Sequence, residues 1–148
     1  MGGALLEADA HNQRGYFEDV DFLTLNRRML AAVVPDEGTG HADWGWTDTM
    51  DVSRAGPAAL DAYASEADAL LERRQQAIVV AGAHVVCWGW KDPRTSVLLD
   101  FWDARVPEAR YVFIYRAPWD VADSMQRLGA DVFLGSPGLA YRIWHHYN

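Results

Sequence analysis

The sequence has 148 residues, of which 50% are hydrophobic and 12% aromatic, and its formal net charge is −8. This length fits one domain that buries a core without a metal or disulfide, and the apolar content excludes intrinsic disorder. The acidic balance argues against nucleic acid or an anionic membrane as a partner, and no apolar run reaches the ~18 residues that a membrane span needs. The single cysteine, Cys87, and an amino end unlike a signal peptide predict a cytoplasmic protein.

The first half of the chain is predicted to hold two helices separated by a long irregular stretch. Apolar positions at helical spacing predict a helix from about Asp19 to Val34. A second helical pattern runs from Pro57 to about Ala77, and proline suits the first turn of a helix. Residues 35–57 are rich in Gly, Asp and Thr. A loop of this length is usually functional or mobile.

In the second half, short apolar runs alternate with helix starts. Residues 84–89 (HVVCWG) and 111–115 (YVFIY) are predicted to be buried strands. Asp92 with Pro93 is predicted to open a helix that runs to about Arg105, Pro118 opens the next, and a last helix is expected from Pro137 to the end. The order strand, helix, strand, helix predicts an α/β fold, with a parallel sheet of few strands flanked by helices.

Charged residues follow both predicted strands where the next helix begins: Lys91 and Arg94 after the first, Arg116 after the second. Parallel sheets bind ligands at the carboxyl ends of their strands, and helix amino termini attract anions. We therefore expect these cations to surround a phosphate or sulfate group, which Ser124 grips together with Arg116 from two turns into the helix. The alternative is that Lys91 pairs with Asp92, that Arg116 pairs with a neighbouring aspartate, and that Ser124 is only a small residue on a helix face.

Two segments resemble the sulfotransferases that use 3′-phosphoadenosine 5′-phosphosulfate as donor: residues 88–95 (WGWKDPRT) and 111–124 (YVFIYRAPWDVADS). Residues 12–19 (NQRGYFED) resemble the part of those enzymes that follows the phosphate loop, and residues 144–148 (WHHYN) resemble a later helix. The resemblance covers nearly the whole chain. It implies a P-loop NTPase-like, nucleotide-binding fold, without a metal. The implied reaction transfers a sulfuryl group to a hydroxyl or amine of a small-molecule or carbohydrate acceptor.

The resemblance also implies roles for single residues. Arg116 and Ser124 match the arginine and serine that bind the 3′-phosphate of the donor, and we place Arg94 in the same donor-binding set. Lys91 matches the lysine near the sulfuryl group, where it would stabilise charge on the bridging oxygen. Ala117 stands where the family often has aspartate, which predicts weaker capping of the helix that begins at Pro118.

The base that accepts the proton of the acceptor is implied by a different part of the resemblance. Some sulfotransferases use a histidine two residues after the lysine, but Pro93 occupies that position here. Others use a glutamate after the phosphate-loop helix, which makes Glu18 the first candidate and Asp19 the second. The alternative for Glu18 is a charge that favours the dipole at a helix amino terminus.

One hallmark of the family is missing from the sequence. No strand is followed by the phosphate loop Gly-x-x-Arg-Ser-Gly-Thr/Ser, and the Gly-rich donor loop near the carboxyl end is missing too. We therefore expect residues 1–148 to be a single, incomplete sulfotransferase-like domain that is inactive alone and self-associates through an exposed sheet edge. The alternative is a non-catalytic truncated module that binds adenosine 3′,5′-bisphosphate through Arg116 and Ser124, or only associates with other chains.

Other chemistries are not indicated by the sequence. His145 and His146 are adjacent, and no acidic or cysteine partner stands at ligand spacing, so no metal site is expected. A Gly-x-Ser-x-Gly elbow, typical of serine hydrolases, does not occur. Four tryptophans are predicted either to line a carbohydrate or aromatic acceptor site or to pack in the core: Trp44, Trp46, Trp88 and Trp90.

Overall fold

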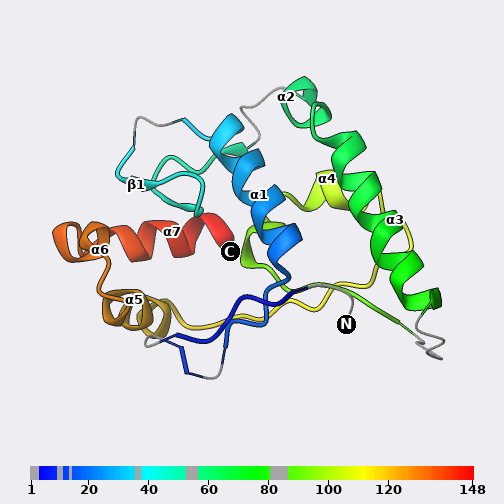
Figure 1. Cartoon of the computed structure of the whole chain (residues 1–148). Helices are drawn as coiled ribbons and strands as arrows, with labels where there is room; N and C mark the ends of the chain where they lie inside the picture. Colours follow the sequence, from blue (N-terminus) through cyan, green and yellow to red (C-terminus); the bar gives the residue numbers. More distant parts are fainter. Residues whose placement is uncertain (1–3, 10–11, 14, 36–37, 53–56, 81–86) are drawn as a thin grey trace.

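The computed structural model describes residues 4–9, 12–13, 15–35, 38–52, 57–80 and 87–148, and this part of the chain is mostly helical (53%). Figure 1 shows α1 in the middle of the molecule, with α3 on one side and α7 on the other. The elements in chain order are α1 (Val20–Val33), β1 (Gly40–His41), β2 (Trp46–Thr47), α2 (Pro57–Asp61), α3 (Ala64–Val80), the 3-10 helix η2 (Pro93–Ser96), α4 (Leu99–Asp103), α5 (Pro118–Arg127), α6 (Asp131–Gly135) and α7 (Leu139–Tyr147). None of the helices in these ranges is both long and apolar enough to cross a membrane.

The predicted fold class, a parallel sheet flanked by helices as in a partial P-loop domain, is wrong. Within the described ranges the sheet is a two-stranded antiparallel hairpin, in which Gly40 pairs with Thr47 and His41 with Trp46. Residues 87–89 and 111–115 are extended but form no strand, and residues 84–86 lie outside the described part. A strand needs a neighbour for its backbone groups and a cover for its side chains, so β propensity without a partner does not make a sheet.

The helices were more accurately predicted than the strands. α1 has Asp19 as its N-cap, whose side chain accepts a hydrogen bond from the Asp21 N–H. The helix predicted from Pro57 is divided into α2 and α3, and the helix predicted from Pro93 is divided into η2 and α4. The last predicted helix is α7, and α6 precedes it. Helix starts are encoded by neighbouring residues, which explains why these positions were predictable.

The long stretch predicted as an irregular loop contains the β hairpin. Gly40 has a φ of +119°, and a Cβ atom there would lie 1.7 Å from the Trp46 carbonyl oxygen, so only glycine fits. At the turn, a Cβ atom on Gly45 would lie 2.1 Å from the Tyr147 hydroxyl oxygen. The close approach of Gly45 to Tyr147 holds the hairpin against the last helix.

The larger hydrophobic core lies between α1, α3 and α4. Trp102 of α4 is fully buried, and its ring lies 5.4 Å from that of Phe22 in α1. On the other side, Phe22 stacks on Trp90 with ring centroids 4.2 Å apart. This core therefore anchors the segment that leads into η2, and with it the charged residues of the candidate site.

A smaller core joins α5, α6 and α7. Its buried residues are Ala122, Phe133, Leu139, Ala140 and Ile143. Trp46 of the hairpin packs on Phe133, with ring centroids 5.4 Å apart. Tyr147 contacts both cores, so the end of α7 connects the two halves of the molecule.

Candidate functional site

A buried carboxylate meets two cations where the chain enters α1 and η2. The Lys91 ammonium donates to Glu18 Oε1 at 2.8 Å and to the Tyr16 carbonyl oxygen at 3.2 Å. The other oxygen, Glu18 Oε2, lies 3.8 Å from Arg94 Nη1. Glu18 is only 6% exposed, whereas the Lys91 side chain is 51% exposed. Three of the residues predicted for the site are thus together, although Lys91 and Glu18 are 73 positions apart.

Asp92 holds this cluster in place. One of its oxygens accepts hydrogen bonds from the Arg94 backbone N–H at 3.0 Å and from Arg94 Nη1 at 2.5 Å, which confirms the predicted N-cap. The other oxygen accepts from Asn26 Nδ2 at 2.8 Å, and Asn26 Oδ1 accepts from Trp102 Nε1 at 2.9 Å. Asp92, Asn26 and Arg94 are all buried. A buried, well-bonded polar network of this kind is rigid. It therefore fixes the backbone position from which the Lys91 side chain extends.

An aromatic wall lies beside the arginine. The Arg94 guanidinium carbon is 5.1 Å from the centroid of the Trp44 ring, and that of Arg27 is 3.9 Å from it. Arg94 Nε is buried and lacks a hydrogen-bond partner in the described part of the chain. Burial raises the pKa of the nearby Tyr147, an effect that Arg94 opposes and Asp92 reinforces, so this phenol stays protonated at neutral pH.

Asp19, the second candidate for the base, has a different set of partners. Arg74 of α3 donates from Nε to Asp19 Oδ2 at 3.1 Å and from Nη2 to Asp19 Oδ1 at 2.8 Å. The same arginine also pairs with Asp21 at 2.5 Å. Because Asp19 is buried and caps α1 as well, its carboxylate connects α1 to α3.

Arg116 and Ser124 lie apart from this cluster in the contacts of the described residues. Arg116 precedes α5 and is exposed, and its carbonyl oxygen accepts a hydrogen bond from Trp144 Nε1 at 2.9 Å. Ser124 is half-buried within α5. No hydrogen bond or ion pair between described residues joins either side chain to Glu18, Lys91 or Arg94. The α5 N-cap, Ala117, makes no side-chain hydrogen bond, as the sequence predicted.

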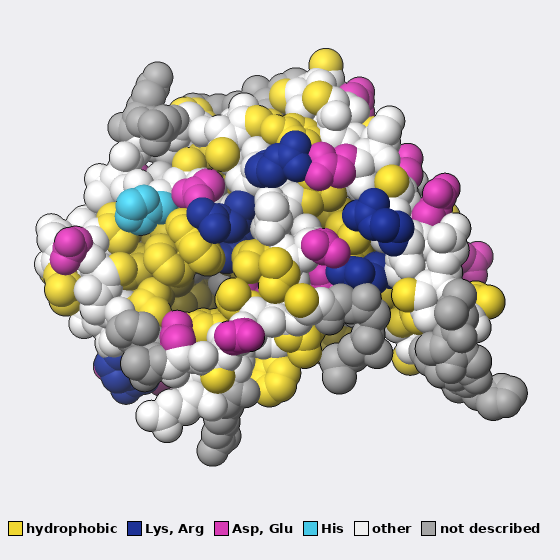
Figure 2. Space-filling view, viewed as in Figure 1, with side chains coloured by type: hydrophobic (Ala, Val, Ile, Leu, Met, Phe, Trp, Pro, Cys, Tyr) yellow, Lys and Arg dark blue, Asp and Glu magenta, His cyan; other side chains and the backbone are white. Residues whose placement is uncertain are grey.

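The cations on the face seen in Figure 2 lie beside acidic groups. Arg27 pairs with Asp43, and Arg28 pairs with Glu66 at 2.6 Å. Lys91 likewise pairs with Glu18 and not with Asp92, its neighbour in the sequence. Arg116, like Arg110, makes no ion pair with another described residue. Its exposed, unpaired charge is what an incoming anion needs.

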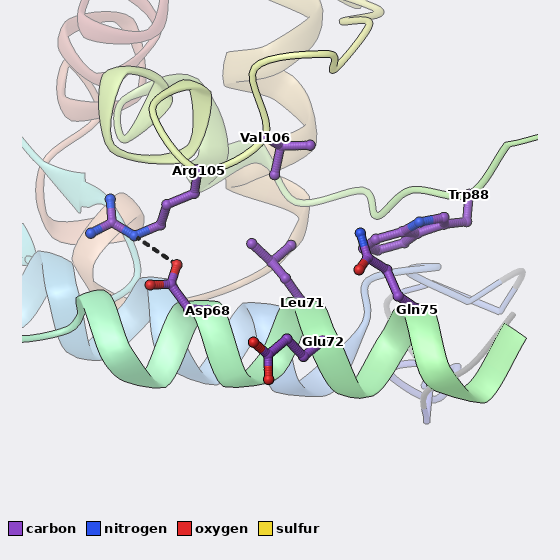
Figure 3. A pocket seen from close by; sticks show the side chains of 7 residues that line it. All are labelled: Asp68, Leu71, Glu72, Gln75, Trp88, Arg105 and Val106. Carbon is purple, nitrogen blue, oxygen red and sulfur yellow. Dashed lines mark ion pairs between the residues drawn. The ribbon is translucent and has the colours of Figure 1, made fainter. Parts of the chain in front are cut away.

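A separate cavity of about 260 Å³ lies between α3 and the end of α4. Figure 3 shows Arg105 pointing toward Asp68, at 3.5 Å, with Trp88 and Gln75 at the other end. None of the predicted catalytic or donor-binding residues lines it. Of the four tryptophans predicted for an acceptor site or for the core, Trp90 packs in the larger core, Trp88 lines this cavity, and Trp44 and Trp46 stack on each other.

The structure adds residues that the sequence reasoning missed. Asn26 interrupts the apolar face of α1, next to Phe22, Leu25 and Met29, and a polar residue on such a face signals a buried hydrogen bond. Trp44 and Tyr147 are placed by the hairpin and by α7, so no local pattern could have associated them with Arg94.

Fold and site together define a mostly helical protein with a buried carboxylate between two cations. In the described ranges, no three His, Cys, Asp or Glu side chains gather as a metal would need. No family model matches the chain, and no curated protein or solved structure matches it either. The likeness to sulfotransferases therefore depends on its sequence motifs.

Proposed function

We propose that this chain is a sulfotransferase-type protein that moves a sulfuryl group from 3′-phosphoadenosine 5′-phosphosulfate to a hydroxyl or amine. The observation that carries the proposal is the 2.8 Å contact between Lys91 and Glu18. These residues come from two distant motifs, to which the resemblance assigns parts of one reaction. The proposal concerns this cluster and does not depend on a parallel sheet.

In the proposed reaction, the acceptor oxygen or nitrogen attacks the sulfur of the donor, and its proton passes to the Glu18 carboxylate. The bond between sulfur and the bridging oxygen breaks, and the electron pair stays on that oxygen of adenosine 3′,5′-bisphosphate. Lys91 stabilises the charge that develops there. An ammonium has three N–H groups, and Glu18 and Tyr16 accept two of those on Lys91, which leaves one for the donor.

Glu18 can accept a proton only when Lys91 moves away from it. The Lys91 side chain is half exposed on a flexible stem, so it can turn toward an incoming sulfuryl group and free Glu18 Oε1. Arg94 cannot turn in this way, because it is 5% exposed and bonded to Asp92. Its burial supports a positioning role beside Glu18 instead of direct contact with the donor.

The donor's 3′-phosphate is assigned to Arg116 and Ser124. The exposure of Arg116 supports this assignment, as does its place immediately before α5, where the positive end of the helix dipole favours an anion. The acceptor is a small molecule or carbohydrate, and the location is cytoplasmic, as expected from the single cysteine.

A second candidate function is a module that binds adenosine 3′,5′-bisphosphate without turnover. The observation that favours it is the state of Glu18, which is buried and has a cation at each oxygen. A carboxylate held in this way also serves to join two segments of a fold.

Calorimetric titration with adenosine 3′,5′-bisphosphate tests the ligand that both candidates share. We expect the wild-type chain to bind and Arg116→Ala to bind at least about tenfold more weakly, a loss of ~1.4 kcal/mol. Arg110→Ala is the matched control, because Arg110 is an exposed arginine on the other side of the same apolar segment. Equal affinity in the wild type and Arg116→Ala overturns the role of Arg116, and no binding by the wild type overturns both candidates.

Turnover separates the two candidates. Bisphosphate release from 3′-phosphoadenosine 5′-phosphosulfate is followed with a panel of hydroxyl and amine acceptors. We expect Glu18→Gln to lose about 100-fold or more in rate while it keeps bisphosphate affinity, since a general base acts on the reacting proton. Turnover by the wild type excludes the non-catalytic module, whereas binding without turnover is the result expected of that module and of a domain that lacks its phosphate loop.

A further inference from the structure

Five consecutive large apolar residues, 111–115, lie on the surface between α4 and α5. Val112 is 89% exposed, Ile114 80%, Phe113 and Tyr115 68% each, and Tyr111 37%. Figure 1 shows this stretch, in yellow, as extended chain that runs outside the helices to α5. A folded monomer rarely leaves an unbroken apolar patch of this kind uncovered. The exposure of the segment therefore indicates a site at which a partner binds.

The backbone of the segment is unpaired as well. In the part of the chain that the structure describes, no backbone hydrogen bond is made by residues 111–115. The nearest contacts mark its ends, where the Ala109 N–H donates to the Val106 carbonyl and Trp144 Nε1 donates to the Arg116 carbonyl. Extended backbone with free N–H and C=O groups, carrying aromatic and β-branched side chains, is the edge to which another strand adds.

Side chains point to both sides of the segment. The Tyr111 and Phe113 rings lie 6.2 Å apart on one side, where Tyr111 also donates to Asp103 and Tyr115 packs on Trp144, whereas Val112 and Ile114 occupy the other side. A partner must therefore satisfy the backbone at the edge and place apolar side chains beside those on each face. A strand of similar composition meets these needs better than a polar loop or a helix does.

The charges next to the segment decide how two copies fit. Antiparallel pairing centred on Phe113 would set Arg110 opposite Arg116, and like charges in opposite positions are destabilising. Pairing centred on Val112 sets Arg110 opposite Ile114, and it brings Glu108, in the turn before the segment, near Arg116 of the other copy at both ends. It also places Tyr111 opposite Phe113, and aromatic pairs across strands are stabilising. Glu108 and Arg116 are exposed, and neither side chain makes an ion pair with another described residue.

We propose that residues 110–114 pair antiparallel with the same residues of a second copy of this chain, around a twofold axis at Val112, with an ion pair between Glu108 and Arg116 beyond each end. The inference does not need the proposed function, but the two share Arg116, so the bound bisphosphate and the dimer compete for its guanidinium. A strand that adds in the plane covers only part of these side chains, so the interface is smaller than those of most specific complexes. The dimer is therefore reversible and depends on concentration.

Sedimentation equilibrium of the full chain over a wide range of concentration tests the pairing. We expect a monomer–dimer equilibrium for the wild type, whose dissociation constant rises at least tenfold in Glu108→Arg and in Arg116→Glu. The double variant Glu108→Arg with Arg116→Glu restores the ion pairs, so its dissociation constant returns toward the wild-type value. A structural disturbance by either single change would not be repaired by the second.

Val112→Lys provides a second test, because it brings two ammonium groups together at the twofold axis. We expect it to abolish the dimer, whereas the control Val79→Lys, at a position on α3 that is 78% exposed, leaves the dimer unchanged. Circular dichroism confirms that each variant keeps its helices. A wild type that is monomeric at every concentration, larger open assemblies, or a dimer unaffected by Glu108→Arg and Val112→Lys overturns the proposal. Mass is measured without ligand, so failure here leaves the proposed function untouched.

Discussion

Two segments of this chain have the same sequence pattern but differ in the contacts and the exposure of their side chains. Residues 87–93 and 111–118 each begin with apolar residues, continue through a cation and end at a proline that starts a helix. In the first, Trp90 stacks on Phe22, and Asp92 is bonded to α1. In the second, four of the five apolar side chains are more than two-thirds exposed. The difference teaches that a distant partner, and not β propensity, decides whether an apolar run is buried.

Removal of the anchor of the first segment has the largest expected effect. Asp92→Ala leaves buried Arg94 with only the more distant Glu18 carboxylate, at 3.8 Å, and removes the cap of η2. We expect the free energy of unfolding to fall by about 3–5 kcal/mol, because breaking a buried, hydrogen-bonded ion pair is costly. Urea denaturation followed by tryptophan fluorescence measures the loss. The matched control is Asp120→Ala, an exposed aspartate in the first turn of α5, and an equal loss in both variants would contradict the anchoring role.

Asn26→Leu weakens the same anchor from the α1 side. The change leaves Asp92 Oδ2 without its Asn26 donor and Trp102 Nε1 without an acceptor. The expected loss is about 2–4 kcal/mol in the free energy of unfolding, since two buried polar groups lose hydrogen bonds. Thr24→Ala, on the exposed side of α1, should change stability by less than ~0.5 kcal/mol. If the two variants were equally stable, the Asn26 network would not be an anchor.

Tyr147 makes the anchored region sensitive to alkali. Its pKa is raised by burial above the ordinary 10.0, so the folded chain keeps the proton that the unfolded chain releases. The stabilising contribution is therefore complete below pH 10 and is lost as the pH rises beyond it. Tyr147→Phe should lose less stability than the wild type on going from about pH 9 to pH 11, by ~1 kcal/mol. Tyr141→Phe, at a residue that is 49% exposed, should follow the wild type; a wild-type-like profile for Tyr147→Phe would refute the assignment.

The second segment lacks the cap that Asp92 supplies to the first. Ala117→Asp places a hydrogen-bond acceptor at the N-cap of α5, where no side chain now bonds. We expect a gain of about 0.5–1 kcal/mol in the free energy of unfolding. Ala117→Lys is the control, because lysine has no acceptor and its charge opposes the helix dipole. Equal stability of the two variants would show that α5 gains nothing from a cap.

Part of the site could be predicted from the sequence, because its signals are short. Asp92 before Pro93 marked a cap, and Glu18 and Lys91 were chosen from two motifs that the structure joins at 2.8 Å. Asp19 was the second candidate for the base. The sequence could not show that its carboxylate pairs with Arg74, because Arg74 lies far away in the chain, in α3. Arg116 and Ser124 remain predictions of the sequence motif.

By itself, the sequence determined where most helices begin, because caps and prolines act within a few residues. Only the tertiary structure decided which apolar runs are buried and which groups contact the charged side chains. Asn26 meets Asp92 across 66 positions, and Trp102 meets Asn26 across 76. In residues 111–115, Tyr115 packs on Trp144 of α7, but most of the segment stays exposed. Burial and backbone pairing are properties of two surfaces, so a pattern in one segment cannot specify them without the other.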